Sequence, residues 1–193
     1  GNTVDRIAIE RLLNGFQGLV VIDEAYIDFT EESSWIQSLN AYPNLIVTHT
    51  LSKAYGLAGI RLGICYASEE IIAVLNKIKP PYNINTLTQE KTSEILGKLD
   101  ERNEAIDIIL AERILLAKAL EEIACVRKIY PSDANFILVK IDDATNIYNK
   151  LVEKSIIVRN RSNVELCENC LRITIGTSKE NKLVIAAIKE ITS

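Results

Sequence analysis

Two apolar runs of the chain lead directly into residues that can do chemistry. Residues 18–22 end at Asp23 and Glu24, and residues 45–49 lead into a turn that contains Lys53. Continuous apolar runs of this length are typical of strands buried on both faces of a parallel sheet. Open α/β sheets bind their ligands at the carboxyl ends of such strands, so Asp23 and Glu24 are candidates for a ligand-binding site.

The pair Asp23-Glu24 is compatible with three kinds of role. An apolar strand that ends in Asp-Glu is typical of the Walker B element of an ATPase, which holds magnesium and a water molecule. An aspartate at this place can instead face the pyridinium nitrogen of a cofactor. It can also cap a turn without any function. A Walker B element needs a GxxxxGK[ST] loop; none occurs in these residues, and an upstream loop would be required, so this alternative stays open here.

The segment after the second run is residues 50–63, T-L-S-K-A-Y-G-L-A-G-I-R-L-G, which we call the lysine turn. A lysine between apolar strands is poorly placed for a surface charge, and partial burial favours the neutral, nucleophilic amine. Thr50, Ser52 and Arg61 supply hydroxyls and a guanidinium, which suit a phosphate dianion. Three glycines would let the backbone approach a ligand closely. The alternative for this segment is a solvated loop.

The four cysteines are too sparse for a disulfide scaffold. Cys167 and Cys170 have metal-ligand spacing, but no second C-x-x-C and no paired histidine accompany them. A structural zinc site needs such further ligands. We therefore expect no metal and interpret the cysteines as reduced thiols. His49, the only histidine, is expected to pack within its strand.

Composition and charge argue against several classes of protein. Charged residues make up 25% of the chain, the net charge is −4, and acidic and basic residues are interspersed. No basic stripe indicates a nucleic-acid partner. No apolar run approaches the length that spans a bilayer, and no signal peptide is visible. We therefore expect no nucleic acid, no membrane and a cytoplasmic location.

Hydrophobic periodicity predicts an α/β fold in which helices and buried strands alternate as far as the break at residues 80–83. A long helical stretch follows, which Gly97 is expected to kink, and the remainder is predicted to be a compact α+β unit. The predicted strands are residues 18–22, 45–49, 62–66, 136–139, 156–158 and 171–175, and the predicted helices are residues 3–14, 33–40, 69–78, 86–124, 144–153 and 179–191.

The lysine turn resembles the cofactor-lysine motif of fold-type I aminotransferases, which use pyridoxal 5'-phosphate (PLP). The D-E-A-Y segment lies 30 residues upstream, counted from Asp23 to Lys53, and fits the same family. Together with C-L-R-I-T-I-G-T near the end, D-E-A-Y-I-D-F and the lysine turn resemble the histidinol-phosphate aminotransferases. The resemblance runs through essentially the whole chain. It implies that residues 1–97 are the remainder of the large PLP-binding α/β domain, with a mostly parallel sheet, and residues 98–193 the small C-terminal α+β domain.

The resemblance implies a role for each matching residue of the two segments. Asp23 would pair with the pyridine nitrogen of PLP and keep it protonated. Tyr26 would hydrogen-bond the phenolic oxygen of the cofactor. Lys53, the catalytic residue, would bind PLP covalently, and its freed amine would shuttle a proton. The residues expected to hold the cofactor phosphate are Ser52, Arg61 and, as a weaker candidate, Thr50.

Two arginines are implied to bind the substrate. Arg172 of L-R-I-T-I-G-T grips the anionic end of the substrate in the family, and Arg159 resembles a second arginine that meets the substrate phosphate. The planar guanidinium groups match the oxygens of a dianion. For each, the alternative is a surface arginine. The implied reaction moves an amino group between the pair histidinol phosphate and imidazole-acetol phosphate and the pair glutamate and 2-oxoglutarate, all small molecules of histidine biosynthesis.

The chain departs from the family in what precedes it. The family carries an N-P-T-G loop, a glycine-rich phosphate turn and a ring-stacking aromatic residue upstream of the position that Asn2 matches. We therefore expect a fragment that lacks the N-terminal half of a homodimeric enzyme. Alone, it is expected to be inactive and to pair with itself through exposed apolar surface and an unpaired strand edge.

Three alternatives remain open on the sequence. Another PLP enzyme of the same fold, such as an aromatic aminotransferase or a phosphothreonine decarboxylase, shares much of the pattern. An ATPase would use L-V-V-I-D-E-A as its Walker B element. A non-catalytic domain would keep the fold as an interaction module and bind PLP without turnover.

Overall fold

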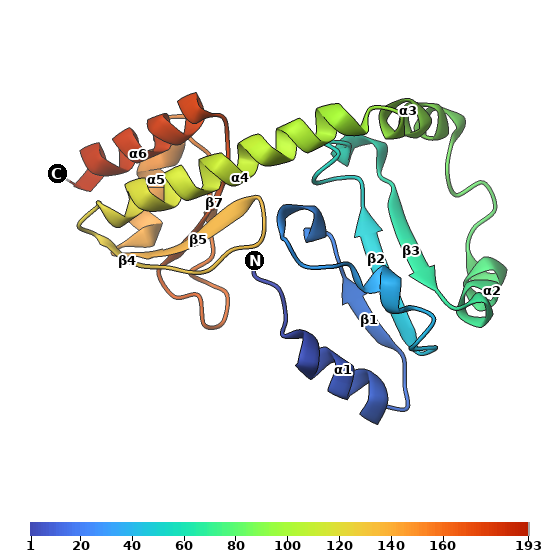
Figure 1. Cartoon of the computed structure of the whole chain (residues 1–193). Helices are drawn as coiled ribbons and strands as arrows, with labels where there is room; N and C mark the ends of the chain where they lie inside the picture. Colours follow the sequence, from blue (N-terminus) through green and yellow to red (C-terminus); the bar gives the residue numbers. More distant parts are fainter. Residues whose placement is uncertain (193) are drawn as a thin grey trace. The chain divides into compact units, whose positions relative to one another are not determined.

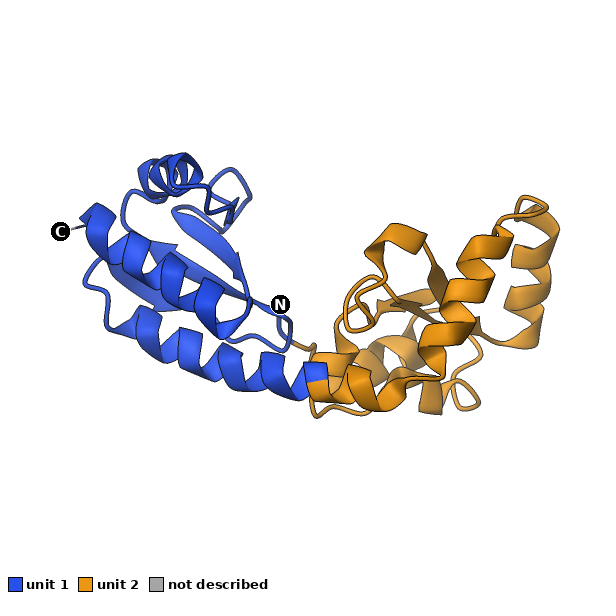
Figure 2. Ribbon diagram, turned by 90° about the horizontal axis from the view of Figure 1, so that it is seen from above, with its two compact units in different colours: residues 1–2, 105–193 blue, residues 3–104 orange. Residues whose placement is uncertain are grey.

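The computed structural model describes residues 1–192, which form two compact units. Unit 2 comprises Thr3–Glu104, and unit 1 comprises Gly1–Asn2 together with Ala105–Ser193 (Figure 2). The division between the units falls inside one helix, α4 (Leu99–Glu121), a little beyond the domain boundary expected between residues 97 and 98.

Unit 2 is built on a three-stranded sheet in the order β1-β2-β3 (Figure 1). β1 (Val20–Asp23) pairs with β2 (Leu45–Thr50) in parallel, and Asp23 lies opposite Thr48. β3 (Gly63–Ala67) is antiparallel to β2, so the lysine turn is the connection between these two strands. An antiparallel neighbour accepts such a short connection, whereas a parallel one needs a longer crossover.

Capped helices flank this sheet. α1 (Arg6–Gly15) begins after Asp5, whose carboxylate accepts a hydrogen bond from the Ile7 amide at 3.1 Å, the usual N-cap arrangement. The buried face of α1 contributes Leu13 to a core that also contains Trp35 and residues of β1 and β2. The remaining helical segments of the unit are η1 (Ile27–Phe29), η2 (Trp35–Ser38), η3 (Ala58–Ile60), α2 (Glu69–Ile78) and α3 (Thr86–Leu96).

Two expectations about helices in this unit are corrected. The helix expected over residues 33–40 is the short 3-10 helix η2, because Ser34 caps it only one residue before Trp35 and the chain must return to β2. The kink expected at Gly97 is a complete break that separates α3 from α4. Glycine weakens a helix interior, which explains a break at this position.

Unit 1 is an antiparallel sheet in the order β4-β5-β7-β6, against which helices pack. Along β5, alternate residues Ile137, Val139 and Ile141 are at most 1% exposed, the period-two pattern of a strand with one buried face. β4 was not expected, because Val126–Ile129 carries two exposed basic residues between its apolar ends. The elements are β4 (Val126–Ile129), β5 (Phe136–Ile141), α5 (Ala144–Glu153), β6 (Arg159–Asn160), β7 (Cys170–Thr174) and α6 (Ser178–Thr192).

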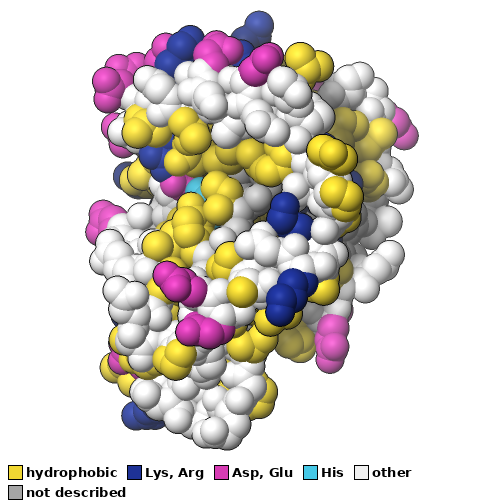
Figure 3. Space-filling model, turned by 90° about the vertical axis from the view of Figure 1, so that its right-hand side faces the viewer, with side chains coloured by type: hydrophobic (Ala, Val, Ile, Leu, Met, Phe, Trp, Pro, Cys, Tyr) yellow, Lys and Arg dark blue, Asp and Glu magenta, His cyan; other side chains and the backbone are white. Residues whose placement is uncertain are grey.

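Two findings concern the apolar segments and apolar surface of the described residues. Within residues 1–192, no helix is both long enough and apolar enough to cross a membrane. Large hydrophobic side chains are nevertheless exposed in unit 2, among them Phe16 (51%), Leu19 (56%) and Val21 (59%) near the free edge of β1. Figure 3 shows hydrophobic side chains gathered in patches between charged ones on one face of the molecule.

Candidate active site

The lysine turn closes on itself through backbone hydrogen bonds. The Gly56 amide donates to the Lys53 carbonyl at 3.0 Å, and the Leu57 amide donates to the Leu51 carbonyl at 2.9 Å. Gly56 has a φ of +66°, a left-handed conformation that glycine adopts without steric cost. Leu51 and Leu57 are 1% and 9% exposed. Two buried leucines therefore anchor the short loop that carries Lys53.

Lys53 contacts the segment that follows β1. The lysine is half-buried, and its Nζ lies 5.3 Å from the centre of the Tyr26 ring. A cation within about 6 Å of an aromatic ring centre is attracted by the negative face of the ring. Because β1 and β2 are parallel and end at the same edge of the sheet, the residues after them meet. The structure thus brings together the lysine and the tyrosine that the sequence singled out.

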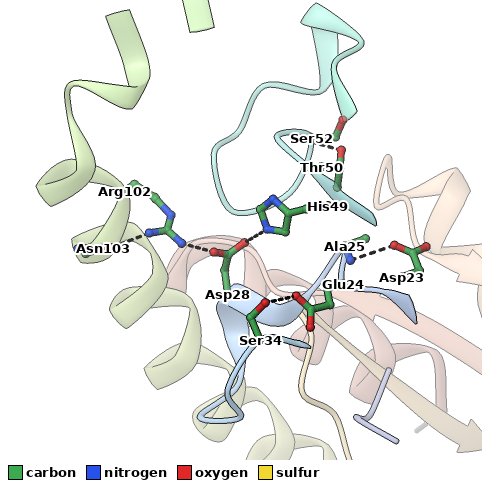
Figure 4. Close-up of polar contacts among 10 residues, drawn as sticks. All are labelled: Asp23, Glu24, Ala25, Asp28, Ser34, His49, Thr50, Ser52, Arg102 and Asn103. Carbon is green, nitrogen blue, oxygen red and sulfur yellow. Dashed lines mark hydrogen bonds and ion pairs between the residues drawn. The ribbon is translucent and has the colours of Figure 1, made fainter. Parts of the chain in front are cut away.

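Asp23 ends β1 at this edge with an exposed carboxylate. Its Oδ1 accepts hydrogen bonds from the Ala25 amide at 3.1 Å and from the Thr48 hydroxyl at 3.3 Å (Figure 4). Thr48 lies opposite Asp23 in the β1–β2 register. Two donors therefore orient the carboxylate while leaving it accessible to a ligand.

Glu24, in contrast, points into the protein. It is 4% exposed, and its carboxylate accepts hydrogen bonds from the Ser34 hydroxyl and the Trp35 amide, both at 2.6 Å (Figure 4). A Walker B glutamate has to reach magnesium or a water molecule, whereas this one is engaged in holding the start of η2. The structure gives no support to the ATPase alternative.

The three residues expected to hold a phosphate lie at the two ends of the lysine turn. The Ser52 amide donates to the Thr50 hydroxyl at 3.1 Å, so these residues are in direct contact. Arg61 follows η3 at the other end, with a φ of +56° and an exposed side chain that donates to the Ala58 carbonyl at 3.0 Å. The structure therefore gathers the predicted PLP residues in unit 2 and keeps the guanidinium of Arg61 accessible.

The two predicted substrate arginines lie in unit 1, directly opposite each other on β6 and β7. Arg172 is half-buried and its guanidinium lies 4.9 Å from the centre of the Phe136 ring, whereas Arg159 is exposed. The Nε of Arg172 is buried and has no hydrogen-bond partner among residues 1–192. Like charges directly opposite in a sheet are unfavourable, so the pair is suited to an anion that lies between them.

A second group of charged side chains is buried beside the lysine turn, and we call it the buried ion cluster. The carboxylate of Asp28, in η1, forms an ion pair with Arg102 of α4 (Figure 4). Its other oxygen lies 3.0 Å from Nε2 of His49, in β2. The guanidinium of Arg102 also lies 4.6 Å from the centre of the Tyr55 ring, and His49 meets the same ring edge-on. The members are Asp28, His49, Tyr55 and Arg102.

The electrostatics of the cluster are those of a satisfied ion pair. Burial by itself raises the pKa of Asp28, but the hydrogen bonds of His49 and Arg102 and the positive charge of Arg102 outweigh it and hold that pKa below its usual value. Burial raises the pKa of the Tyr55 hydroxyl, because the phenolate would lose hydration. The Asp28 carboxylate is therefore kept charged by its two neighbours.

Sequence reasoning missed this cluster. Asp28 belongs to D-E-A-Y-I-D-F and His49 directly precedes the lysine turn, so both lay beside recognised motifs. Arg102, however, is 74 residues from Asp28 and has no local pattern that marks it. His49 does pair with Ile64 in the β2–β3 ladder, as strand packing requires, but its ring also binds the carboxylate.

The cysteines form no metal centre in the described part of the chain. Within residues 1–192, no group of three or more His, Cys, Asp or Glu side chains could hold a metal ion. All four cysteines are free, and the Cys170 amide donates to the Cys167 carbonyl at 3.0 Å in the turn before β7. Burial raises the pKa of the Cys170 thiol, which makes it a poor nucleophile.

Several known proteins are similar to this chain over nearly its whole length. Histidinol-phosphate aminotransferase of Flavobacterium johnsoniae is 58% identical over 189 residues, which cover 98% of this chain and 54% of the relative. The crystal structure of histidinol-phosphate aminotransferase from Sinorhizobium meliloti, in complex with pyridoxal-5'-phosphate, superposes with a TM-score of 0.83 at 27% identity, covering 94% of this chain and 52% of that one. L-threonine-O-3-phosphate decarboxylase of Porphyromonas gingivalis gives a TM-score of 0.88 at 26% identity, with coverages of 100% and 61%.

The chain spans about half the length of the curated relatives it matches. Residues 1–188 match the family described as aminotransferase class I and II. The matched range contains both predicted site segments and both arginines. The predicted α/β fold of the C-terminal part of a fold-type I enzyme is confirmed. This chain belongs to the class I and II aminotransferase family.

Proposed function

We propose that this chain supplies the cofactor-binding lysine of a PLP-dependent aminotransferase of histidine biosynthesis. The observation that carries the proposal is the contact between Lys53 and Tyr26, because it joins the two segments of the family motif. The high identity to the F. johnsoniae enzyme supports histidinol phosphate and 2-oxoglutarate as one substrate pair, and imidazole-acetol phosphate and glutamate as the other.

The side chains at the ends of β1 and β2 fit PLP in their chemistry. The accessible carboxylate of Asp23 suits a protonated pyridine nitrogen, and the phenol of Tyr26 suits the phenolic oxygen. The hydroxyls and guanidinium of the lysine turn suit a phosphate dianion. When bound, PLP supplies an electron sink for the negative charge that develops on the substrate carbon. The proposed cofactor ligands are Asp23, Tyr26, Thr50, Ser52, Lys53 and Arg61.

Lys53 has two proposed tasks. Its Nζ would hold the cofactor, and the same amine, when free, would act as the base that takes up the proton lost by the substrate carbon and gives it back. Contact with the Tyr26 ring limits the directions in which the side chain can point. Leu51 and Leu57 keep the turn that bears the amine closed. Preorganisation of this kind places a general base without loss of freedom at the moment of reaction.

Arg159 and Arg172 are proposed to bind the anionic end of the substrate. Their guanidinium groups share one face of the β6–β7 ladder, and the buried Nε of Arg172 lacks a partner. A buried donor without a partner costs about 1–3 kcal/mol, and a substrate phosphate or carboxylate would recover part of that cost. We expect the arginine pair to set affinity more than the rate of proton transfer.

The experiment uses an extended protein, in which this chain is joined to the part of the F. johnsoniae enzyme that it does not match. Amino transfer from glutamate to imidazole-acetol phosphate is followed, with phenylpyruvate as a competing acceptor and phosphothreonine decarboxylation as a parallel assay. We expect transfer to imidazole-acetol phosphate to dominate and to be abolished in Lys53→Ala. Dominant decarboxylation would favour the second candidate function, which the likeness to the P. gingivalis decarboxylase supports.

Assembly and location are part of the same proposal. We propose a cytoplasmic homodimer with small-molecule substrates and no nucleic-acid or membrane partner, as the family resemblance implies. We also propose that residues 1–97 and 98–193 are its large-domain and small-domain portions, and that the 193-residue chain alone is inactive. PLP binding by the extended protein without turnover of any of these substrates would favour the non-catalytic module instead.

A further inference from the structure

The buried ion cluster joins the two segments that meet at Lys53. Asp28 lies two residues after Tyr26, and Tyr55 lies two residues after Lys53. Lys53 and Tyr26 contact each other, while Asp28 and Tyr55 are both held by the guanidinium of Arg102. The two segments are therefore joined twice. Lys53 contacts Tyr26 directly, and Arg102 contacts both Asp28 and Tyr55.

The same cluster holds the start of the lysine turn. His49 directly precedes Thr50, and its ring contacts both the Asp28 carboxylate and the Tyr55 ring. The Asp28 carboxylate is therefore bound by His49, which precedes the turn, and by Arg102, whose guanidinium lies over the Tyr55 ring (Figure 4 shows Asp28, His49 and Arg102). Asp28 and His49 side chains are only 8% and 10% exposed.

The backbone hydrogen bonds within the turn do not provide this tie. The hydrogen bonds between Gly56 and Lys53 and between Leu57 and Leu51 connect the turn to itself. They fix its shape but not its position against the segment after β1. Arg102 is held in the cluster by its terminal nitrogens, because Nη2 binds the Asp28 carboxylate and Nη1 donates to the Asn103 side chain.

We propose that the buried ion cluster positions the lysine turn so that Lys53 faces Tyr26, an inference that rests on the proposed function. Its members act through the backbone on either side of Lys53 and Tyr26. Arg102 is the positioning residue that links the two segments. It acts on the turn through the contact between its guanidinium and the Tyr55 ring.

The first test needs no cofactor and uses the 193-residue chain. Reductive methylation with formaldehyde and cyanoborohydride is followed lysine by lysine with peptide mass spectrometry, over a range of pH. Hydrogen exchange at the Gly56 and Leu57 amides is measured in parallel. In Arg102→Met and in Tyr55→Leu, we expect both the methylation of Lys53 and the exchange of these amides to rise about tenfold, as loss of a partly buried cation–π contact would allow.

Two variants serve as matched controls. Arg6 also stacks on an aromatic ring in unit 2, 4.2 Å from the centre of the Trp35 ring, and donates hydrogen bonds to Ser33 and Ser38. Arg6→Met therefore removes an equivalent contact away from the lysine turn and is expected to leave Lys53 unchanged. Tyr55→Phe keeps the ring and is expected to behave as the unmutated chain. Tyr55→Leu, which leaves Arg102 and its ion pair in place, keeps the test decisive if Arg102→Met does not fold.

The second test traps PLP on Lys53 of the extended protein with borohydride. We expect Tyr55→Leu to reduce the trapped fraction severalfold, and Arg6→Met and Tyr55→Phe to leave it unchanged. Equal changes in Arg6→Met and Tyr55→Leu in either test would overturn the positioning role, because the effect would then be general loosening of the unit. Absence of PLP on Lys53 in the unmutated extended protein would overturn the proposed function and this role with it, whatever the methylation of the chain shows.

Discussion

Replacing Asp28 with asparagine removes the charge that Arg102 and His49 share, while the shape of the side chain is nearly conserved. The side chains of Asp28 and Arg102 are 8% and 20% exposed, so their ion pair is largely removed from water. Breaking a buried ion pair from one side costs about 3–5 kcal/mol, because the remaining charge is left uncompensated. Arg102 keeps some access to water, so we expect about 3 kcal/mol, near the lower limit.

The single tryptophan gives an assay for this variant, because Trp35 lies in the core of unit 2 and is 7% exposed. Its fluorescence during urea unfolding reports on the unit that contains the mutation. With a denaturant dependence of roughly 2 kcal/mol per molar urea, a loss of about 3 kcal/mol lowers the midpoint by about 1.5 M.

Glu94 offers the matched control, since it too is a carboxylate of unit 2 with two basic neighbours, Lys91 and Lys98. Its side chain is 51% exposed, and exposed ion pairs contribute little to stability. We expect Glu94→Gln to leave the urea midpoint within experimental error. If Asp28→Asn shifted the midpoint no further than Glu94→Gln does, the cluster would not be an energetically important buried ion pair, and the reasoning would be refuted.

Three further predictions follow from the same unit. The pKa of Asp28 is held below its ordinary value of 3.8, so its contribution to stability is present above about pH 4 and is lost as pH falls through the lower pKa of the folded state. The difference in urea midpoint between the wild type and Asp28→Asn should therefore shrink over that pH range. A difference that stays constant would contradict the lowered pKa. Glu24→Gln removes one of the two carboxylate oxygens that accept from the part-buried Ser34 hydroxyl and the buried Trp35 amide. It should cost about 2 kcal/mol with a red shift of the Trp35 emission, whereas an unchanged spectrum would argue that the carboxylate is dispensable. The isolated chain should self-associate through the edge of β1, and Val21→Lys should abolish the concentration dependence of its sedimentation, since a lysine at an edge blocks strand pairing; a wild-type chain that stays monomeric at high concentration would contradict this.

Sequence reasoning succeeded where a local pattern carries the structure. The apolar runs before Asp23 and before the lysine turn mark β1 and β2, because continuous burial leaves a continuous apolar stretch. The helices at residues 69–78 and 144–153 coincide with α2 and α5, whose apolar residues recur at the helical period. Motifs in the same regions indicated the family that the comparisons identify.

Sequence reasoning failed where the determining contact is distant. Nothing near residue 102 indicates that its guanidinium pairs with a carboxylate in η1, since this contact depends on how α4 begins beside the sheet. The direction of β3 was not predicted either, because an apolar strand has the same pattern in a parallel and an antiparallel pair. Likewise, D-E-A-Y does not reveal that Asp23 is accessible while Glu24 is buried against Ser34.

The most direct test of the central claim is to reduce the PLP-treated extended protein with borohydride and to locate the adduct by peptide mass spectrometry. The account predicts that one adduct, on Lys53, dominates over all other lysines, and that Asp23→Ala weakens it while Glu24→Gln leaves its position unchanged. Adducts spread among surface lysines, or concentrated on a lysine other than Lys53, would contradict the assignment of this turn as the cofactor site.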